Sequence, residues 1–490
     1  YSPSAKGVIG QESFYTGQPN RYSHWEPSPT SFRNPSGAVF ANNEVWVADT
    51  GNNRVTAFPN FVEAGDTAGA HKLLGQVAYE YRAPNFIQGR EFSGGSLTST
   101  VALGPAAVVD RSSDPPRLYI ADTGNNRILG FADARRAQSG DFADIVIGQV
   151  DFYRALVNSP TSDAVNPSEA GLFLPSMVAV DKEGNLWVAD TGNSRVLRYP
   201  SPFAKWGEQQ LPDLVIGRES FTAPATIEVG ASSMGFPSGL ALSDGGQLYV
   251  RDLLYNRVLR FDPPFASGMA ATVVFGQPDF TSTTSGNGDD KLSFPLGLAV
   301  DSGGNLMVAD AGNDRVAVFS RANGETMNGV NGVQAIKPTT GKMSPRSIAI
   351  SHLNGDIFVT DSNNGSVRRF PHYVEIQRQF AFSQTIVSNF SFFAAGPRNI
   401  ALDASGNLLV LDSVNRMTMH YPQLIASNWE NGFYRLAPGL ITRVVVPGVK
   451  LPGAPAAAGE APLPKELAAL EILVNGVPSP IFSLSEDAGS

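Results

Sequence analysis

Seven aspartates and five arginines recur at fixed positions in this sequence, and their side chains are the groups best suited to chemistry. The aspartates are Asp49, Asp122, Asp190, Asp252, Asp310, Asp361 and Asp412, and the arginines, each five residues later, are Arg54, Arg127, Arg195, Arg257 and Arg315. A ring of carboxylates could bind a metal ion or act as a general base. Catalysis, however, needs one group in one special environment. The sevenfold repetition therefore predicts that each aspartate fixes a turn by accepting bonds from backbone N–H groups and its arginine. We predict no catalytic residue and no metal site.

Each aspartate is the fifth residue of a fourteen-residue unit, as in LYIADTGNNRILGF at 118–131. The seven copies span 45–58, 118–131, 186–199, 248–261, 306–319, 357–370 and 408–421. Apolar residues alternate on both sides of the central turn, which is typical of two short strands. Asp, Gly and Asn suit the turn because they tolerate left-handed backbone. Each unit therefore predicts a β-hairpin.

Two further features flank the hairpins. A proline followed by a short apolar strand precedes every copy, at Pro35, Pro105, Pro175, Pro237, Pro295, Pro345 and Pro397. A strand with Gly-Gln or Gly-Arg follows most copies, at 73–76, 145–152, 214–221 and 273–280. The complete repeat is thus four strands, and seven four-stranded sheets arranged radially form a β-propeller.

The segment GVIGQESF at 7–14 has the sequence of the fourth strand but stands before the first hairpin. No matching Gly-Gln strand follows the last hairpin. We therefore expect residues 7–14 to supply the outer strand of blade seven, which closes the ring and protects an open sheet edge.

These motifs resemble the NHL repeat over about residues 7–425, in the proline-led strand and the VADTGNNRV-type hairpin. The Gly-Gln strand is similar to that of secreted bacterial NHL-repeat proteins that carry a C-terminal β-sandwich-type appendage. The resemblance implies an all-β, seven-bladed β-propeller, which is a fold and not an activity. Some related propellers are metal-dependent lyases or lactonases. The five histidines of this chain share no repeat offset, which departs from the zinc lyases.

The repeat pattern predicts three segments: a propeller at 1–440, a strand and Pro/Ala-rich linker at 441–464, and a β-hairpin at 465–490. The hairpin turns at Asn475-Gly476, a strong hairpin signal. It is too short for a sandwich of about 100 residues and is interpreted as an incomplete Ig-like module. Such an orphan hairpin could add strands to a neighbouring subunit. The candidate assembly residues are Ile472, Val474, Val477, Ile481 and Phe482.

Composition narrows the class of partner. The net charge of −9 argues against a nucleic-acid partner, which requires a concentrated basic face. The absence of cysteine excludes disulfides and thiolate sites. No run of 18 apolar residues is present, so no membrane span is expected.

Residue 1 is Tyr, which we interpret as the start of a mature chain from which a targeting signal was removed. We therefore expect the protein to be secreted or on a bacterial cell surface.

Three arginines depart from the repeat pattern. Arg346 and Arg398 follow the blade prolines, where Ser or another small residue stands in most other copies, and Arg251 replaces the alanine before Asp252. The start of an innermost strand lies near the channel mouth of a propeller, so these arginines are candidates to bind an anion or an acidic chain. The alternative is that they pair with nearby carboxylates.

The sequence favours a secreted, non-enzymatic scaffold that contacts other proteins, including copies of itself, and assembles into a filament or surface layer through its tail. It has no predicted cofactor. The long segments 76–100 and 153–174 are the candidate contact loops. Two alternatives stay open: a lyase- or lactonase-type enzyme with an axial active site, and a receptor for an acidic ligand or glycan.

Overall fold

The computed structural model of the chain contains two compact units, residues 1–421 and 422–490. The residues that it describes are 7–13, 16–21, 26–41, 44–59, 69–83, 87–93, 107–224, 228–320, 334–337, 342–353, 355–373, 384–387, 396–403, 406–413, 415–420, 425–428, 442–445, 456–457, 466–467, 470–474, 477–479 and 483–484.

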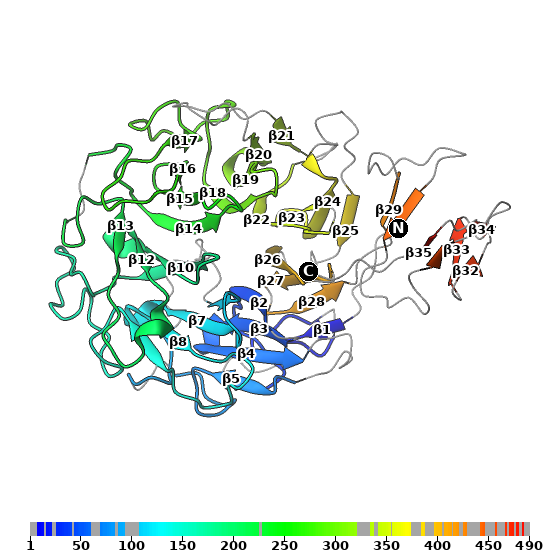
Figure 1. The fold of residues 1–490 in the computed structure, drawn as a ribbon. Helices are drawn as coiled ribbons and strands as arrows, with labels where there is room; N and C mark the ends of the chain where they lie inside the picture. The colour runs from blue at the N-terminus through cyan, green and yellow to red at the C-terminus, as the bar shows by residue number, and fades with distance from the viewer. Residues whose placement is uncertain are drawn as a thin grey trace. The chain divides into compact units, whose positions relative to one another are not determined.

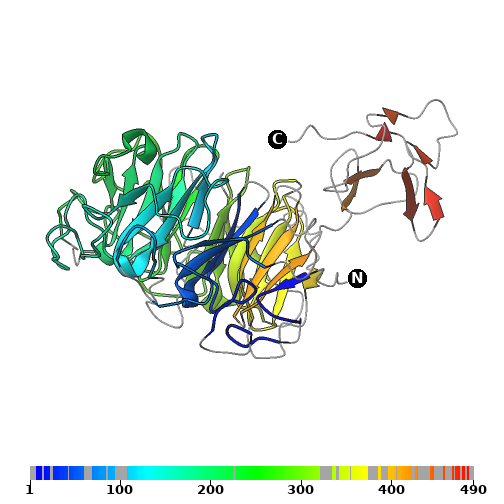
Figure 2. The same ribbon diagram turned by 90° about the horizontal axis from the view of Figure 1, so that it is seen from below.

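The first unit is a ring of seven four-stranded antiparallel sheets (Figures 1 and 2). This arrangement confirms the predicted all-β, seven-bladed β-propeller. The first strand of each blade lies nearest the axis, and the fourth lies at the rim (Figure 1).

The blades consist of the following strands. Blades one to four are β2 (Gly37–Ala41), β3 (Glu44–Asp49), β4 (Arg54–Pro59) and β5 (Lys72–Leu74); β6 (Ala107–Asp110), β7 (Arg117–Asp122), β8 (Arg127–Phe131) and β9 (Ile145–Ile147); β10 (Pro175–Val180), β11 (Leu186–Asp190), β12 (Arg195–Tyr199) and β13 (Leu214–Ile216); and β14 (Pro237–Leu242), β15 (Leu248–Asp252), β16 (Arg257–Phe261) and β17 (Val273–Phe275). Blades five to seven are β18 (Pro295–Val300), β19 (Leu306–Asp310), β20 (Arg315–Phe319) and β21 (Gln334–Ile336); β22 (Pro345–Ile350), β23 (Ile357–Asp361), β24 (Ser366–Phe370) and β25 (Gln384–Val387); and β26 (Pro397–Leu402), β27 (Leu408–Asp412), β28 (Met417–His420) and β1 (Gly7–Ile9).

The N-terminal strand closes the ring. β1 pairs antiparallel with β28, with Gly7 opposite Met419 and Ile9 opposite Met417. The predicted closure is therefore confirmed, although the strand covers Gly7–Ile9 rather than the whole of 7–14. Blade seven thus combines three strands from the end of the propeller sequence with one from its start.

The hairpin turns follow the local sequence. In blade one, η1 (Thr50–Asn52) fills the turn between β3 and β4, and Asn53 ends it with φ at 52°. A residue with left-handed backbone also ends η2 (Thr123–Asn125), η3 (Thr191–Asn193) and η5 (Ala311–Asn313). These residues are Asn126, Ser194 and Asp314. Asn, Ser and Asp accept this conformation at lower cost than branched residues, which explains the composition of the turn.

The core of the propeller lies between neighbouring blades. Tyr119 and Ile128 of blade two, for example, are buried against Leu186 and Val188 of blade three. Each such side chain contributes about 1.5–3 kcal/mol on burial. Hydrogen bonds add to this packing, because the hydroxyl of Thr123 donates to the carbonyl of Pro175 in the next blade at 2.8 Å. Thr191 and Ser362 make the corresponding bonds to Pro237 and Pro397.

The described residues of the second unit form short strands. β29 (Ile425–Asn428) pairs with β30 (Thr442–Val445), and β31 (Ala456–Ala457) pairs with β35 (Ser483–Leu484). A three-stranded sheet contains β32 (Glu466–Leu467), β33 (Leu470–Val474) and β34 (Val477–Ser479). Val474 of β33 pairs antiparallel with Val477 of β34.

Candidate functional site

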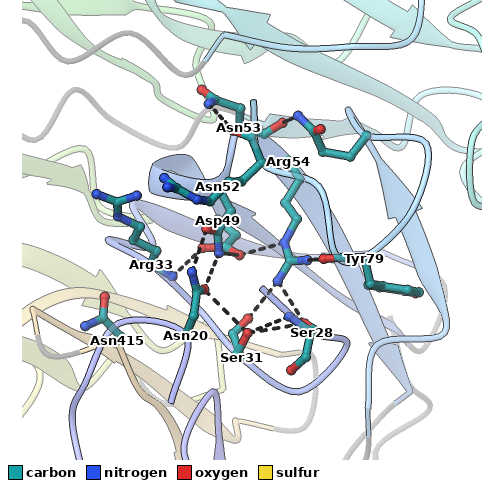
Figure 3. Close-up of polar contacts among 12 residues, drawn as sticks. Asn20, Ser28, Ser31, Arg33, Asp49, Asn52, Asn53, Arg54, Tyr79 and Asn415 are labelled. Carbon is teal, nitrogen blue, oxygen red and sulfur yellow. Dashed lines mark hydrogen bonds and ion pairs between the residues drawn. The ribbon is translucent and has the colours of Figure 1, made fainter. Parts of the chain in front are cut away.

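The repeat aspartate is buried and fully engaged, as blade one illustrates (Figure 3). One oxygen of Asp49 accepts the backbone N–H of Arg33 at 2.7 Å, and the other accepts Nδ2 of Asn52 and Nε of Arg54, both at 2.7 Å. The side chains of Asp49 and Arg54 are both inaccessible to solvent. This carboxylate is therefore occupied by protein donors.

The arginine of the pair connects three parts of the blade (Figure 3). In blade one, Nη1 of Arg54 donates to the carbonyl of Tyr79, which follows the fourth strand, and Nη2 donates to the carbonyls of Ser28 and Ser31 in the entering loop, all at 2.9 Å. In blades two, three and four the Nη1 acceptor is the carbonyl of Phe152, Phe221 or Phe280, the last residue of the motif that contains Gly-Gln or Gly-Arg. The arginine thus explains why that motif recurs.

Burial of these pairs makes the ionised form of each aspartate less favourable. Burial raises the pKa of Asp49 from its ordinary value, and the charge of Arg54 and the bonds from Arg33 and Asn52 oppose the rise. Burial acts in the same direction on the pKa of Asp122 and Asp190. Within the described residues, no group of three or more His, Cys, Asp or Glu side chains is arranged to hold a metal ion. Each Asp–Arg pair therefore acts as a structural cross-link.

Two members of this set of pairs were not recognised in the sequence. Arg368 contacts Asp361 of blade six at 2.8 Å, and Arg416 contacts Asp412 of blade seven at 2.6 Å. These arginines lie seven and four residues after their aspartates, whereas the other five lie five residues after. The sequence does place an arginine within seven residues after Asp361 and after Asp412, but not at the spacing of the other five pairs. With them, every repeat aspartate has an arginine partner.

Arg251, a candidate ligand-binding residue, is held by its own blade. Its Nη2 donates to the carbonyl of Ser238 at 2.5 Å, and its Nε donates to the hydroxyl of Ser238 at 3.3 Å. The side chain is buried, and burial lowers the pKa of Arg251 to about 10. Its guanidinium therefore stabilises the start of strand β14, at Ser238, rather than projecting into the channel.

Arg346 and Arg398, the other two candidates, lie together at the inner edge of blades six and seven. Arg346 is the second residue of β22, and Arg398 is the second residue of β26. Both are half-buried, and their guanidinium groups have neither an ion pair nor a hydrogen-bond partner among the residues that the structure describes. Burial lowers the pKa of Arg398, the neighbouring charge of Arg346 lowers it further, and Asp412 opposes the change.

Exposed apolar side chains gather on blades one to three. Nine of the twelve large apolar residues exposed in the described part of the chain lie between residues 77 and 211; these nine are Val77, Tyr81, Ile87, Phe142, Val150, Tyr153, Val165, Trp206 and Leu211. Six of them lie in or next to the predicted contact loops 76–100 and 153–174. We call these six, Val77, Tyr81, Ile87, Val150, Tyr153 and Val165, the loop surface.

The candidate assembly residues fall in the second unit. Ile472 and Val474 belong to β33, and Val477 belongs to β34. Ile481 and Phe482 lie outside the described residues. The structure therefore gives the strands of this segment and leaves its role in assembly a prediction.

No helix in the described part of the chain has the length and hydropathy needed to cross a bilayer.

The chain is similar to known propellers. The family model of the NHL repeat matches residues 32–58, 174–199 and 292–319, which end with the hairpins of blades one, three and five. A streptogramin B lyase structure is 11% identical with a TM-score of 0.49, over 81% of this chain and 96% of that one. The virginiamycin B lyase of Staphylococcus aureus is 12% identical with a TM-score of 0.47, over 79% and 95%. The WD40 propeller domain of Doa1 is 9% identical with a TM-score of 0.47, over 86% and 97%.

The matched family model and the seven blades agree with each other. The NHL matches fall on the proline-led strand and hairpin that the repeat pattern defines, at a regular place in alternate blades. The chain therefore contains NHL repeats and folds as a seven-bladed β-propeller.

Proposed function

We propose that this protein is an extracellular protein-binding scaffold that contacts its partner through the loop surface. The observation that carries the proposal is the concentration of exposed apolar side chains on that surface. Tyr153 and Val165 are 73% and 70% exposed. Large apolar side chains grouped on ordered loops favour contact with another protein.

The loops that carry these residues are anchored. Asn158 is buried and exchanges side-chain hydrogen bonds with Asn193, at 3.1 and 2.7 Å, and the hydroxyl of Ser168 donates to the carbonyl of Ser159 at 2.6 Å. Such anchoring lowers the entropy that is lost on binding. The exposed residues are therefore presented on a preorganised surface.

One repeat pair holds both contact loops. Nη2 of Arg127 donates to the carbonyls of Gln88 and Glu91, and its Nη1 donates to the carbonyl of Phe152. The first two acceptors belong to one loop and the third begins the other. The structural Asp–Arg pair of blade two thus positions the loop surface.

The partner that we propose is a second copy of the chain. The three-stranded sheet of the second unit has β32 and β34 at its edges, and strand edges can pair with a strand from another chain. Contact through the loop surface, together with strand addition by the tail, would give a repeating assembly. Secretion is part of the proposal and agrees with the cysteine-free composition.

Sedimentation velocity and electron microscopy of the full chain test this function. We expect concentration-dependent dimers or longer assemblies for the wild type. The double variant Tyr153→Ser/Val165→Ser is expected to weaken association at least tenfold, because it removes two exposed apolar side chains. Leu353→Ser, which changes an exposed leucine of blade six, is the matched control and should leave association unchanged.

A second variant tests the tail. Val474→Asp/Val477→Asp places like charges on paired residues of β33 and β34, so it should prevent assemblies larger than a dimer. Wild-type chain that stays monomeric at every concentration would contradict self-association. Association that the Tyr153→Ser/Val165→Ser variant retains in full would remove the loop surface from the contact.

A further inference from the structure

Arg346 and Arg398 are the only positively charged residues on the innermost strands that the structure describes. These strands, β2, β6, β10, β14, β18, β22 and β26, otherwise carry Gly, Ala, Val, Leu, Ile, Ser and other uncharged residues, apart from Asp110. Asp110 is the last residue of β6, and it has Arg117 as a salt-bridge partner at 3.5 Å. The two arginines begin their strands, so they stand at the opposite end of the inner wall from that pair.

β-Bulges hold both arginines outside the regular ladder. In blade six, Pro345 pairs with Asp361 and the next pair is Ile348 with Val359, so Arg346 lies in the irregular segment between them. There the hydroxyl of Thr360 accepts the backbone N–H of Arg346 at 3.2 Å. A bulge redirects a side chain and is a built feature of a sheet.

Blade seven repeats this geometry. Pro397 pairs with Asp412 and the next pair is Asn399 with Leu411, so Arg398 lies at the bulge. β22 and β26 are the innermost strands of adjacent blades. The two side chains therefore start from equivalent points on neighbouring rigid hairpins.

The repeat carboxylates of blades six and seven are already engaged by other arginines. Asp412, which acts on Arg398, is paired with Arg416 at 2.6 Å, and Asp361 is paired with Arg368 at 2.8 Å. Two half-buried guanidinium groups are thus left close together without a counter-charge among the described residues. Like charges in this position repel each other and destabilise the fold unless an anion joins them.

We propose that Arg346 and Arg398 form a binding site for the carboxylate or phosphate group of a ligand at the axis of the propeller. Each guanidinium offers five N–H donors in a planar fork, which matches two oxygens of such a group. The weakly polar residues of the inner strands would strengthen the attraction, because fewer solvent dipoles screen it. This site is separate from the loop surface and extends the proposed function.

Titration calorimetry on the full chain, in a buffer of low ionic strength, tests the site. The probes are malonate for the carboxylate group and inorganic phosphate for the phosphate group, with neutral malonamide as the control ligand. We expect saturable binding of at least one anion to the wild type and none of malonamide. Arg398→Gln should weaken binding at least tenfold, and Arg346→Gln/Arg398→Gln should abolish it. The anion that binds more tightly identifies the chemical source of the ligand.

Arg136→Gln is the matched control variant. Arg136 is 90% exposed and paired with Asp133 on an outer loop of blade two, so the change removes the same charge without touching the inner wall. It should bind the anions like the wild type. Thermal unfolding gives a second readout. Without an anion, Arg398→Gln should unfold at a higher temperature than the wild type because the repulsion is gone, and it should lose the stabilisation that the anion gives to the wild type.

Two results would overturn the proposal. The first is the absence of saturable binding of both anions to the wild type. The second is binding by Arg346→Gln/Arg398→Gln that equals that of the wild type, which would place the site elsewhere. Arg346→Lys/Arg398→Lys keeps the charges and should bind more weakly than the wild type, so the test does not depend on whether the glutamine variant folds. The self-association of these variants should be normal, which distinguishes failure of this site from failure of the scaffold function.

Discussion

At the scale of single residues, the seven blades require the same contact but obtain it from different sequence positions. The contact is an ion pair between an arginine Nε and Oδ2 of the repeat aspartate. In five blades this arginine lies five residues after the aspartate. Arg368 and Arg416 reach the same place from other offsets. Sequence comparison could find the aspartates because their spacing is fixed by the turn. It could not find these two arginines, because a long side chain can reach one acceptor from several positions.

Arg218 is another departure that matters at this scale. After the fourth strand of blades one, two, four and seven, a glutamine follows the glycine, and its amide donates to backbone carbonyls, as Gln149 does to Asn126 at 3.0 Å and Leu156 at 2.8 Å. Blade three has Arg218 instead, 3% exposed, with Nε and Nη2 lacking any partner among the described residues. Burial lowers the pKa of Arg218, and nearby Tyr255 opposes the change.

The variant Arg218→Gln is therefore expected to stabilise the protein. It replaces a buried guanidinium, of which Nε and Nη2 lack partners among the described residues, with the amide that four other blades use, and the free energy of unfolding should rise by about 1–3 kcal/mol. Chemical denaturation measures the change. The exposed control Arg136→Gln should stay within about 0.5 kcal/mol of the wild type. A loss of stability in Arg218→Gln would show that the guanidinium makes a compensating interaction.

At the scale of elements, the strands and hairpins follow closely from the sequence, but the packing between them does not. In blade three, a side chain on Gly192 would collide with Phe173, so the small residue is on the hairpin turn. In blade four the small residue is on the other side, since a side chain on Gly235 would collide with Leu254 of the turn. A glycine on either side of the contact leaves room for the large side chain on the other side. The composition of the repeat therefore does not show which side carries the large residue. The hydrogen bonds of Arg251 to Ser238 could not be inferred from the sequence either, because they depend on the bulge between Pro237 and Gly239.

The closing strand β1 gives the test at this scale. Ile9 is buried with Phe32, Leu409 and Met417, and Ile9→Ala should cost about 2–4 kcal/mol. Ile216→Ala, in the fourth strand of blade three, should cost a similar amount. Hydrogen exchange separates the two variants, because only Ile9→Ala should increase the exchange of β1 and β28 ahead of global unfolding. Equal exchange patterns in both variants would contradict the view that the closure is a weak point.

At the scale of the whole molecule, the ring is complete without the second unit. The two compact units divide at residue 421, and every blade obtains its fourth strand from residues 7–387. The repeat pattern of the sequence predicted this ring, because each blade is built from local hairpins. The place of the last blade's fourth strand could also be read from the motif at 7–14.

Removal of residues 422–490 should therefore leave the stability of the propeller unchanged. The midpoint of thermal unfolding, followed by tryptophan fluorescence, is expected to lie within about 2 °C of that of the full chain, which corresponds to about 2 kcal/mol or less for a domain of this size. The same truncated chain should lose any assembly that depends on the tail. A large fall in the midpoint would show that the second unit stabilises the ring.

The pairing of β1 with β28 also determines when the ring can close during synthesis of the chain. β1 must wait for its partner β28, which is made about 400 residues later. At about 5–20 residues per second, the delay is roughly 20–80 s. During this time six blades can form from local hairpins while the edge of blade one has no neighbour. Nascent chains are therefore most vulnerable to misassembly just before the ring closes, and a chaperone that shields one apolar blade face would act in that interval.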